Sequence, residues 1–130
     1  MATILILEDD ADVRTLLAAV LRLDGHRVLE AGSVRQAEKV MDGHQVDCLV
    51  ADLILRGREG GTDFALNLHR AQPKAHIVFM SGWPEGRAQD QENISTLPPD
   101  SLTVLQKPFA VGEFLDRIRA CLNGRRVKTA

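Results

Sequence analysis

Chemically reactive side chains follow four separate apolar runs of the sequence. The triplet Glu8-Asp9-Asp10 follows the run 4–7, Asp52 stands near the end of 47–55, Ser81 follows 77–80 and Lys107 follows 102–106. Each of these alone is a weak signal, because a carboxylate after a strand is often a helix cap and a Ser-Gly pair is often only a turn. Their joint occurrence, each at the same end of its run, indicates one shared site.

This set of side chains suits the transfer of a phosphoryl group to a carboxylate. Three carboxylates in one cleft repel one another unless a cation joins them, and hard oxygen ligands with room for water suit Mg²⁺. A carboxylate such as Asp52 can attack phosphorus and become an acyl phosphate. The Ser81 hydroxyl and the compact charge of Lys107 can then hold two of the phosphoryl oxygens. The sequence therefore predicts a site at which Asp52 is phosphorylated with the help of Mg²⁺.

The elements that must position these groups alternate along the chain. Five short apolar runs are predicted as strands, at residues 4–7, 26–31, 47–55, 77–80 and 102–106. Segments with apolar residues at helical spacing separate them. This alternation predicts an α/β fold with a parallel sheet and about five helices on both of its faces. The carboxyl ends of parallel strands meet at one edge, which is where ligands bind in such sheets.

Local signals predict where the helices begin and end. Asp10 and Ser33 are expected to cap the first two helices, and Gly25 and Gly43 to terminate them. A third helix is expected at 62–71 and a weak or mobile helix within the polar segment 83–100. The last helix is expected to end at 123–124. We therefore predict a single domain over residues 1–124 and a basic, disordered tail over 125–130.

Composition limits the classes of partner. The 130 residues carry 16 Lys and Arg against 18 Asp and Glu, a net charge of -2, which gives no reason to expect direct nucleic-acid or membrane binding. No signal peptide is visible, and no apolar stretch approaches the roughly 18 residues that a transmembrane helix needs. The two cysteines, Cys48 and Cys121, have no metal-type spacing. We expect a soluble protein of the cytoplasm with reduced cysteines.

Several motifs together resemble one family over essentially the full length of the chain. They are residues 4–10 (ILILEDD) with Arg14, residues 51–61 (ADLILRGREGG), residues 80–82 (MSG) and residues 106–109 (QKPF). With these motifs the chain resembles a response-regulator receiver domain of two-component signalling. The resemblance implies a flavodoxin-like, doubly wound fold of five parallel strands in the order 2-1-3-4-5.

The resemblance also implies a role for each matching residue. Asp52 would be the phospho-acceptor, Asp9 a direct Mg²⁺ ligand and Glu8 a ligand acting through water. The backbone carbonyl of Ile54 would complete the protein ligands of the metal. Ser81 would be the switch hydroxyl and Lys107 the lysine that pairs with phosphate, followed by a cis peptide bond to Pro108.

One position departs from the family pattern. Val104 stands where the family often has an aromatic side chain that swings inward when the hydroxyl engages the phosphate. The resemblance therefore implies an intact phosphorylation site together with a switch that lacks its usual aromatic part.

The resemblance implies partners rather than a conventional enzymatic activity. A sensor histidine kinase or a phosphotransfer protein would donate the phosphoryl group, and a downstream protein or an attached output domain would receive the signal. The domain itself would show only weak autophosphorylation from small phosphodonors and autodephosphorylation.

Three alternatives remain open on the sequence alone. The stretch Asp10-Ala11-Asp12-Val13 matches the DxDx[TV] element of haloacid-dehalogenase-type phosphatases, with Asp10 and Asp12 as its carboxylates. That family also needs an acidic pair after its lysine, and none follows Lys107 closely. A flavin-binding module of the same fold would want a phosphate cradle rich in Ser and Thr, which the loops lack. The third alternative is a degenerate receiver that binds partners without phosphate.

Overall fold

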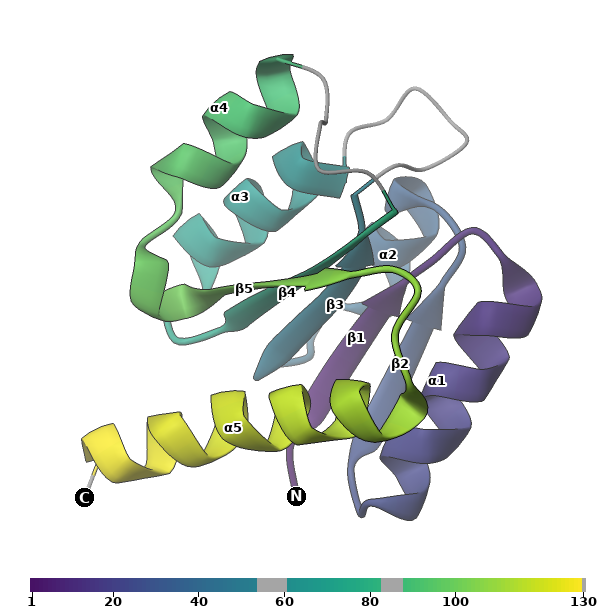
Figure 1. Cartoon of the computed structure of the whole chain (residues 1–130). Coiled ribbons are helices and arrows are strands. Elements are labelled where there is room, and N and C mark those ends of the chain that lie inside the picture. The colour runs from purple at the N-terminus through teal and green to yellow at the C-terminus, as the bar shows by residue number, and fades with distance from the viewer. Residues whose placement is uncertain (54–60, 83–87, 130) are drawn as a thin grey trace.

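The computed structural model describes residues 1–53, 61–82 and 88–129, which form a central sheet between two layers of helices (Figure 1). Strands and helices alternate along the chain, as predicted. The elements in order are β1 (Thr3–Leu7), α1 (Ala11–Leu23), β2 (Arg27–Ala31), α2 (Val34–Val40), β3 (Cys48–Asp52), α3 (Gly61–Ala71), β4 (His76–Ser81), α4 (Ala88–Thr96), the 3-10 turn η1 (Pro99–Ser101), β5 (Leu102–Gln106) and α5 (Val111–Thr129).

The strands are all parallel and lie in the order β2-β1-β3-β4-β5. This is the order that the family resemblance implied, so the predicted fold class is confirmed. In the register of the sheet, Leu7 lies opposite Ala51 and Asp52 lies opposite Met80. The carboxyl ends of β1, β3 and β4 therefore reach the same edge of the sheet.

Apolar side chains cover both faces of the sheet, because neighbouring residues of a strand point to opposite sides. Ile4 and Ile6 of β1 belong to the core beneath α1 and α5, while Leu5 and Leu7 belong to the core beneath α2 and α3. Every residue of β3 and β4 is buried. Burial on both faces is typical of the central strands of a parallel sheet, as predicted for the strand that carries Asp52.

The predicted starts of the first two helices are confirmed. The helix α1 ends just before Gly25, as predicted, whereas α2 ends at Val40, three residues before Gly43. The Asp10 Oδ1 atom accepts hydrogen bonds from the backbone N–H groups of Asp12 (3.0 Å) and Val13 (3.2 Å), so Asp10 caps α1. Ser33 Oγ accepts one from the N–H of Gln36 (3.1 Å) and caps α2. Gly25 and Gly43 follow these helices with φ of 90° and 76°, a conformation that residues with a Cβ atom rarely adopt.

The helix α4 is attached to α3 by buried polar side chains. Thr62 Oγ1 donates to Asp90 Oδ1 (2.7 Å), and Asn93 Nδ2 donates to Thr62 Oγ1 (3.0 Å) and to Asp63 Oδ1 (2.7 Å). Thr62, Asp90 and Asn93 are all buried. We refer to Thr62, Asp63, Asp90 and Asn93 as the α3–α4 network. These hydrogen bonds hold α4 against α3, although the apolar pattern of this segment predicts only a weak helix.

The C-terminal end of the chain corrects one prediction. We expected the last helix to end at 123–124, but α5 continues to Thr129. The division of the chain into a domain over 1–124 and a basic tail over 125–130 stays a prediction. A glycine inside a helix costs only about 1 kcal/mol relative to alanine, and Arg and Lys are good helix formers, so Gly124 does not force an end. No helix that the structure describes is both long and apolar enough to cross a bilayer.

Candidate functional site

The predicted site residues meet at the carboxyl edge of the sheet. Glu8 and Asp9 follow β1 directly, Asp52 and Ser81 are the last residues of β3 and β4, and Lys107 follows β5. Backbone hydrogen bonds hold the ends in register: the N–H of Lys107 donates to the carbonyl of Ser81 (2.7 Å) and the N–H of Glu8 to that of Ala31 (3.0 Å). Residues almost one hundred positions apart in sequence thus become neighbours, as the parallel topology predicts.

Three carboxylates form an acidic cluster at this edge, which we define as Glu8, Asp9 and Asp52. Each offers a carboxylate oxygen, and these three atoms all lie within 4.8 Å of one another. Glu8 and Asp52 are only 1% and 9% exposed. Water therefore screens their mutual repulsion poorly, and the cluster favours a positively charged partner.

Lys107 supplies one positive charge to this cluster. Its Nζ atom donates to Asp52 Oδ2 (2.9 Å) and to Glu8 Oε1 (3.2 Å). Burial lowers the pKa of Lys107, but the hydrogen bond and charge of Asp52, together with those of Glu8, outweigh this effect and the net pKa is raised. The lysine therefore stays charged between two carboxylates.

Among the described residues, Lys107 is the cation that pairs with these carboxylates, and its charge does not prevent the pKa of Glu8 from rising. Burial, followed by the charge and hydrogen bond of Asp52, raises the pKa of the Glu8 carboxyl to about 7, although the charge of Lys107 acts in the opposite direction. A divalent cation would relieve this repulsion. Clustered carboxylate oxygens are the ligands that Mg²⁺ prefers, so the donor set fits the predicted metal.

Arg14 holds the loop that carries Glu8 and Asp9, and Glu30 lies near the guanidinium of Arg14. Arg14 Nη1 donates to the backbone carbonyl of Glu8 (2.7 Å), and Arg14 Nε lies 3.8 Å from Glu30 Oε1 on β2. A Cβ atom placed on Gly32 would lie 2.9 Å from that Arg14 nitrogen, so Gly32 leaves room for the guanidinium. Sequence reasoning included Arg14 in a motif without giving it a role, because the contact with the Glu8 carbonyl depends on how α1 folds back.

Ser81 is the last residue of β4, and Val104 lies in the middle of β5. Ser81 is 5% exposed and lies opposite Gln106 in the sheet. Val104 is 49% exposed and lies opposite Phe79. The roles of Ser81 as a switch hydroxyl and of Val104 as a position without the usual aromatic remain predictions.

Two details implied by the resemblance have different outcomes. The peptide bond between Lys107 and Pro108 is cis, as expected. Ile54, whose carbonyl was expected to complete the metal ligands, lies outside the described residues. Asp10, which the phosphatase alternative needs as its nucleophile, instead caps α1 with its side chain.

Known proteins support one family over nearly the whole chain. A family model described as the response regulator receiver domain matches residues 4–119. The chain is 31% identical over 122 residues to the regulatory protein VirG of Agrobacterium tumefaciens, covering 94% of this chain and 44% of VirG. It is also 29% identical over 124 residues to the sensor kinase CckA of Brucella abortus, covering 93% of this chain and 12% of that kinase. The chain thus spans less than half the length of these two relatives.

A solved structure shows the same fold at lower sequence identity. The CheY-like receiver domain protein of Methanospirillum hungatei matches 98% of both chains with a TM-score of 0.84 at 16% identity. Neither the family model nor these relatives support the phosphatase alternative based on Asp10 and Asp12. Because the family model covers most of its residues, the chain belongs to the response regulator receiver domain family.

Proposed function

We propose that this chain accepts a phosphoryl group on Asp52, with a phosphohistidine of a sensor histidine kinase or a phosphotransfer protein as the donor. The observation that carries the proposal is the position of Asp52. Its carboxylate lies at the edge of the sheet within 4.8 Å of the Glu8 and Asp9 oxygens and 2.9 Å from the Lys107 ammonium. A single carboxylate thus lies beside groups suited to both a metal and a phosphoryl group.

The proposed reaction moves the phosphoryl group from nitrogen to oxygen. An Asp52 carboxylate oxygen attacks phosphorus, an O–P bond forms and the P–N bond to the donor imidazole breaks. The electron pair of that bond stays on the imidazole nitrogen, which takes a proton from solvent. Lys107, already 2.9 Å from Asp52, can then pair with a phosphoryl oxygen, and the Ser81 hydroxyl is proposed to bind another.

Mg²⁺ held by Glu8, Asp9 and Asp52, with the Ile54 carbonyl as the implied fourth protein ligand, would neutralise charge on the phosphoryl oxygens. Lys107 and Arg14 position the carboxylates of the same site. Lys107 holds the Asp52 carboxylate in place, and Arg14 fixes the backbone of the loop that carries the other two carboxylates.

The consequence of phosphorylation is proposed to be a change of surface rather than turnover of a substrate. Ser81 ends β4, so a bond from its hydroxyl to the phosphoryl group would act on the segment that leads to α4 and β5. A downstream protein partner or an attached output domain would read that change. Only slow autophosphorylation by small phosphodonors and autodephosphorylation are proposed as activities of the domain itself. The cytoplasmic location stays a prediction.

The test is direct labelling of the protein. Incubation with acetyl phosphate and Mg²⁺ is expected to add the mass of one phosphoryl group, detected by mass spectrometry of the intact protein. The Asp52→Asn variant should remain unlabelled. Asp12→Asn is the matched control, because Asp12 is an exposed aspartate in the first turn of α1. Equal labelling of the Asp52→Asn variant would refute the assignment.

A further inference from the structure

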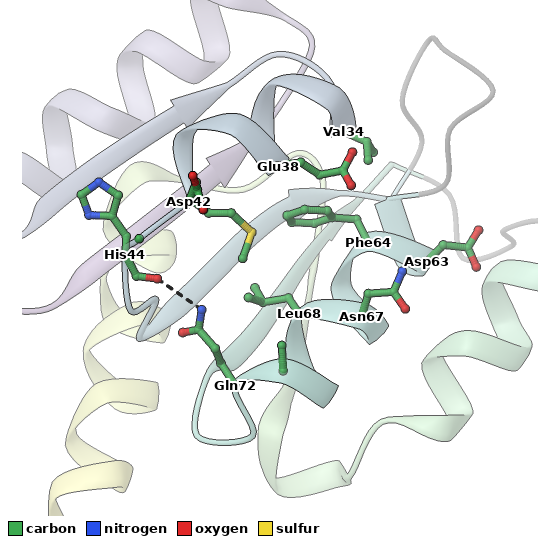
Figure 2. A pocket seen from close by; sticks show the side chains of 12 residues that line it. Val34, Glu38, Asp42, His44, Asp63, Phe64, Asn67, Leu68 and Gln72 are labelled. Carbon is green, nitrogen blue, oxygen red and sulfur yellow. Dashed lines mark hydrogen bonds between the residues drawn. The ribbon is translucent and has the colours of Figure 1, made fainter.

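A second candidate site lies away from the acidic cluster, between α2 and α3. A groove of about 480 Å³ opens between α2, the turn that follows it and α3. Figure 2 shows Phe64 and Leu68 of α3 at its base, with Val34 at one end. This volume falls within the range of pockets that hold small organic ligands.

The base of the groove is apolar and well anchored. Phe64 and Leu68 are buried in the core beneath α2 and α3, and Met41 packs against the same core. The Gln72 side chain holds one end of the groove, since its Nε2 donates to the His44 carbonyl (3.3 Å) and its Oε1 accepts from the backbone N–H of Val46 (2.7 Å). The groove is therefore built into the fold, and a ligand would lose little affinity to reorganising it.

The rim of the groove is negatively charged. Glu38 and Asp42 line its α2 side and Asp63 lines its α3 side. In Figure 2 the Glu38 carboxylate lies next to Phe64, whereas the Asp63 carboxylate points away from it. No Lys or Arg is among the described residues that line it. Glu38 and Asp42 form no ion pair with any residue in the described ranges. Among the described residues, Glu38 and Asp42 are thus available to a positively charged ligand, whereas Asp63 already accepts a hydrogen bond from Asn93 (2.7 Å).

From this apolar base and acidic rim we infer that the groove binds a small amphipathic organic cation, with an apolar or aromatic body on Phe64 and Leu68 and an ammonium or amidinium group at the rim carboxylates. An apolar body gains from burial, and a flat cation also matches carboxylates by paired hydrogen bonds. This binding does not depend on phosphorylation of Asp52.

Asp63 connects this groove to the rest of the molecule. The same carboxylate that lines the groove accepts the hydrogen bond from Asn93 Nδ2 on α4 (2.7 Å). A cation at the rim would therefore share Asp63 with Asn93. The side-chain amide signals of Asn93 are expected to move together with those of the groove residues when the site fills.

The test uses three probes of the same shape and different charge, namely benzamidine, benzamide and benzoate. Each is titrated into ¹⁵N-labelled protein in saturating Mg²⁺, which occupies the acidic cluster, while chemical shifts are followed residue by residue. Benzamidine is expected to shift signals of α2, α3 and Asn93 and to bind about fivefold or more tightly than benzamide, as one or two partly screened charge pairs would give. Benzoate should not bind.

Charge variants of the rim separate this site from a general attraction to acidic surfaces. The double variant Glu38→Gln, Asp42→Asn is expected to weaken benzamidine by about five- to tenfold without unfolding, because both side chains are exposed. The matched control Glu113→Gln, an exposed glutamate in the first turn of α5, should leave binding unchanged. Asp52→Asn should bind benzamidine as the unmodified protein does, so failure here and failure of Asp52 labelling are distinguishable.

Three outcomes would overturn the inference. They are equal affinity for benzamidine and benzamide, unchanged affinity in the double rim variant, and shifts confined to residues outside α2, α3 and α4. A further arm uses the blocked dipeptide acetyl-Phe-Arg-amide. If it binds at least tenfold more tightly than benzamidine, the occupant is a basic side chain of a protein and the proposal of a free small cation is wrong.

Discussion

The acidic cluster and the α3–α4 network both bury polar groups, but they do so in opposite ways. Among the described residues, the acidic cluster sets three carboxylates beside Lys107, and burial together with the charge and hydrogen bond of Asp52 raises the pKa of Glu8 to about 7. In the α3–α4 network, neutral donors face the carboxylates: the Thr62 hydroxyl donates to Asp90 and the Asn93 amide donates to Asp63. One cluster holds like charges together, whereas the other pairs donors with acceptors.

This difference suits the acidic cluster to binding a cation and the α3–α4 network to holding two helices together. Like charges held together reduce the stability of the fold, and a cation or a rearrangement of charge can recover that free energy on binding. In the α3–α4 network, hydrogen bonds between the buried Thr62, Asp90 and Asn93 side chains instead fix the two helices that they join. We therefore expect substitutions in the two clusters to change stability in opposite directions.

The largest expected effect is the pH dependence of the acidic cluster. The pKa of Glu8 is raised from 4.5 to about 7, so the folded protein binds more protons than the unfolded chain between these values. The contribution of Glu8 to stability therefore falls as the pH rises from 4.5 through 7, by an amount on the order of 3 kcal/mol. Urea unfolding at about pH 5 and about pH 8, in buffer with EDTA, measures it.

Glu8→Gln isolates this contribution, because it cannot ionise. The stability difference between Glu8→Gln and the unmodified protein should grow in favour of the variant as the pH rises. If the free energy of unfolding of the two proteins changed with pH in the same way, the ionisation of Glu8 would not affect stability. The contrast between the two clusters would then disappear.

The next effect concerns the α3–α4 network. Asn93→Leu removes the donor to Thr62 and Asp63 while keeping a similar size, and is expected to destabilise the fold by about 1–3 kcal/mol, because a buried oxygen loses its partner. Asn67→Leu, an exposed asparagine on α3, is the control and should change stability by about 0.5 kcal/mol or less. Equal effects of the two substitutions would mean that the network adds no stability.

A smaller effect is expected from the metal. At a concentration about tenfold above its dissociation constant, Mg²⁺ should raise the free energy of unfolding by about 1.4 kcal/mol. The gain should be greater at about pH 8 than at about pH 6, because a protonated Glu8 is a poorer ligand. Thermal unfolding with and without Mg²⁺ measures it. Asp9→Asn should lose most of the gain, and an undiminished gain in that variant would place the metal elsewhere.

The smallest effect sharpens the separation of the two clusters. Thr62→Val keeps the shape of the side chain, removes the donor to Asp90 and should destabilise by about 1 kcal/mol. Its labelling by acetyl phosphate should match that of the unmodified protein. Slower labelling at equal stability would show that the network and the acidic cluster act together rather than separately.

The acidic cluster could be predicted from the sequence because the topology of the sheet is enough to bring its residues together. Asp52 and Lys107 each sit at the end of an apolar run, and a parallel sheet brings all such ends to one edge. The strand β5 was predicted at the bounds that are observed, since prolines flank a short run rich in β-forming residues. What could not be predicted is that the Lys107 ammonium lies between Asp52 and Glu8, because this depends on side-chain packing.

The α3–α4 network escaped prediction for a related reason. Thr62 and Asp90 are 28 positions apart, and neither belongs to an apolar pattern that would mark its helix face. Hydrophobic periodicity therefore predicted only a weak helix in 83–100, although buried hydrogen bonds hold it against α3. The groove was missed as well, because its base and rim come from two helices whose approach the sequence does not specify.

The room that Gly32 leaves for Arg14 has a consequence for the mutational tolerance of the chain. A methyl group at this position would lie 2.9 Å from the Arg14 guanidinium, so Arg14 would have to shift and its hydrogen bond to the Glu8 carbonyl would weaken. In a saturation mutagenesis screen for signalling, Gly32 should therefore behave like a site residue. In an Arg14→Ala background Gln36 Oε1 remains at 3.5 Å, an ordinary contact, so Gly32→Ala should add little further loss and the effects of the two positions should not be additive.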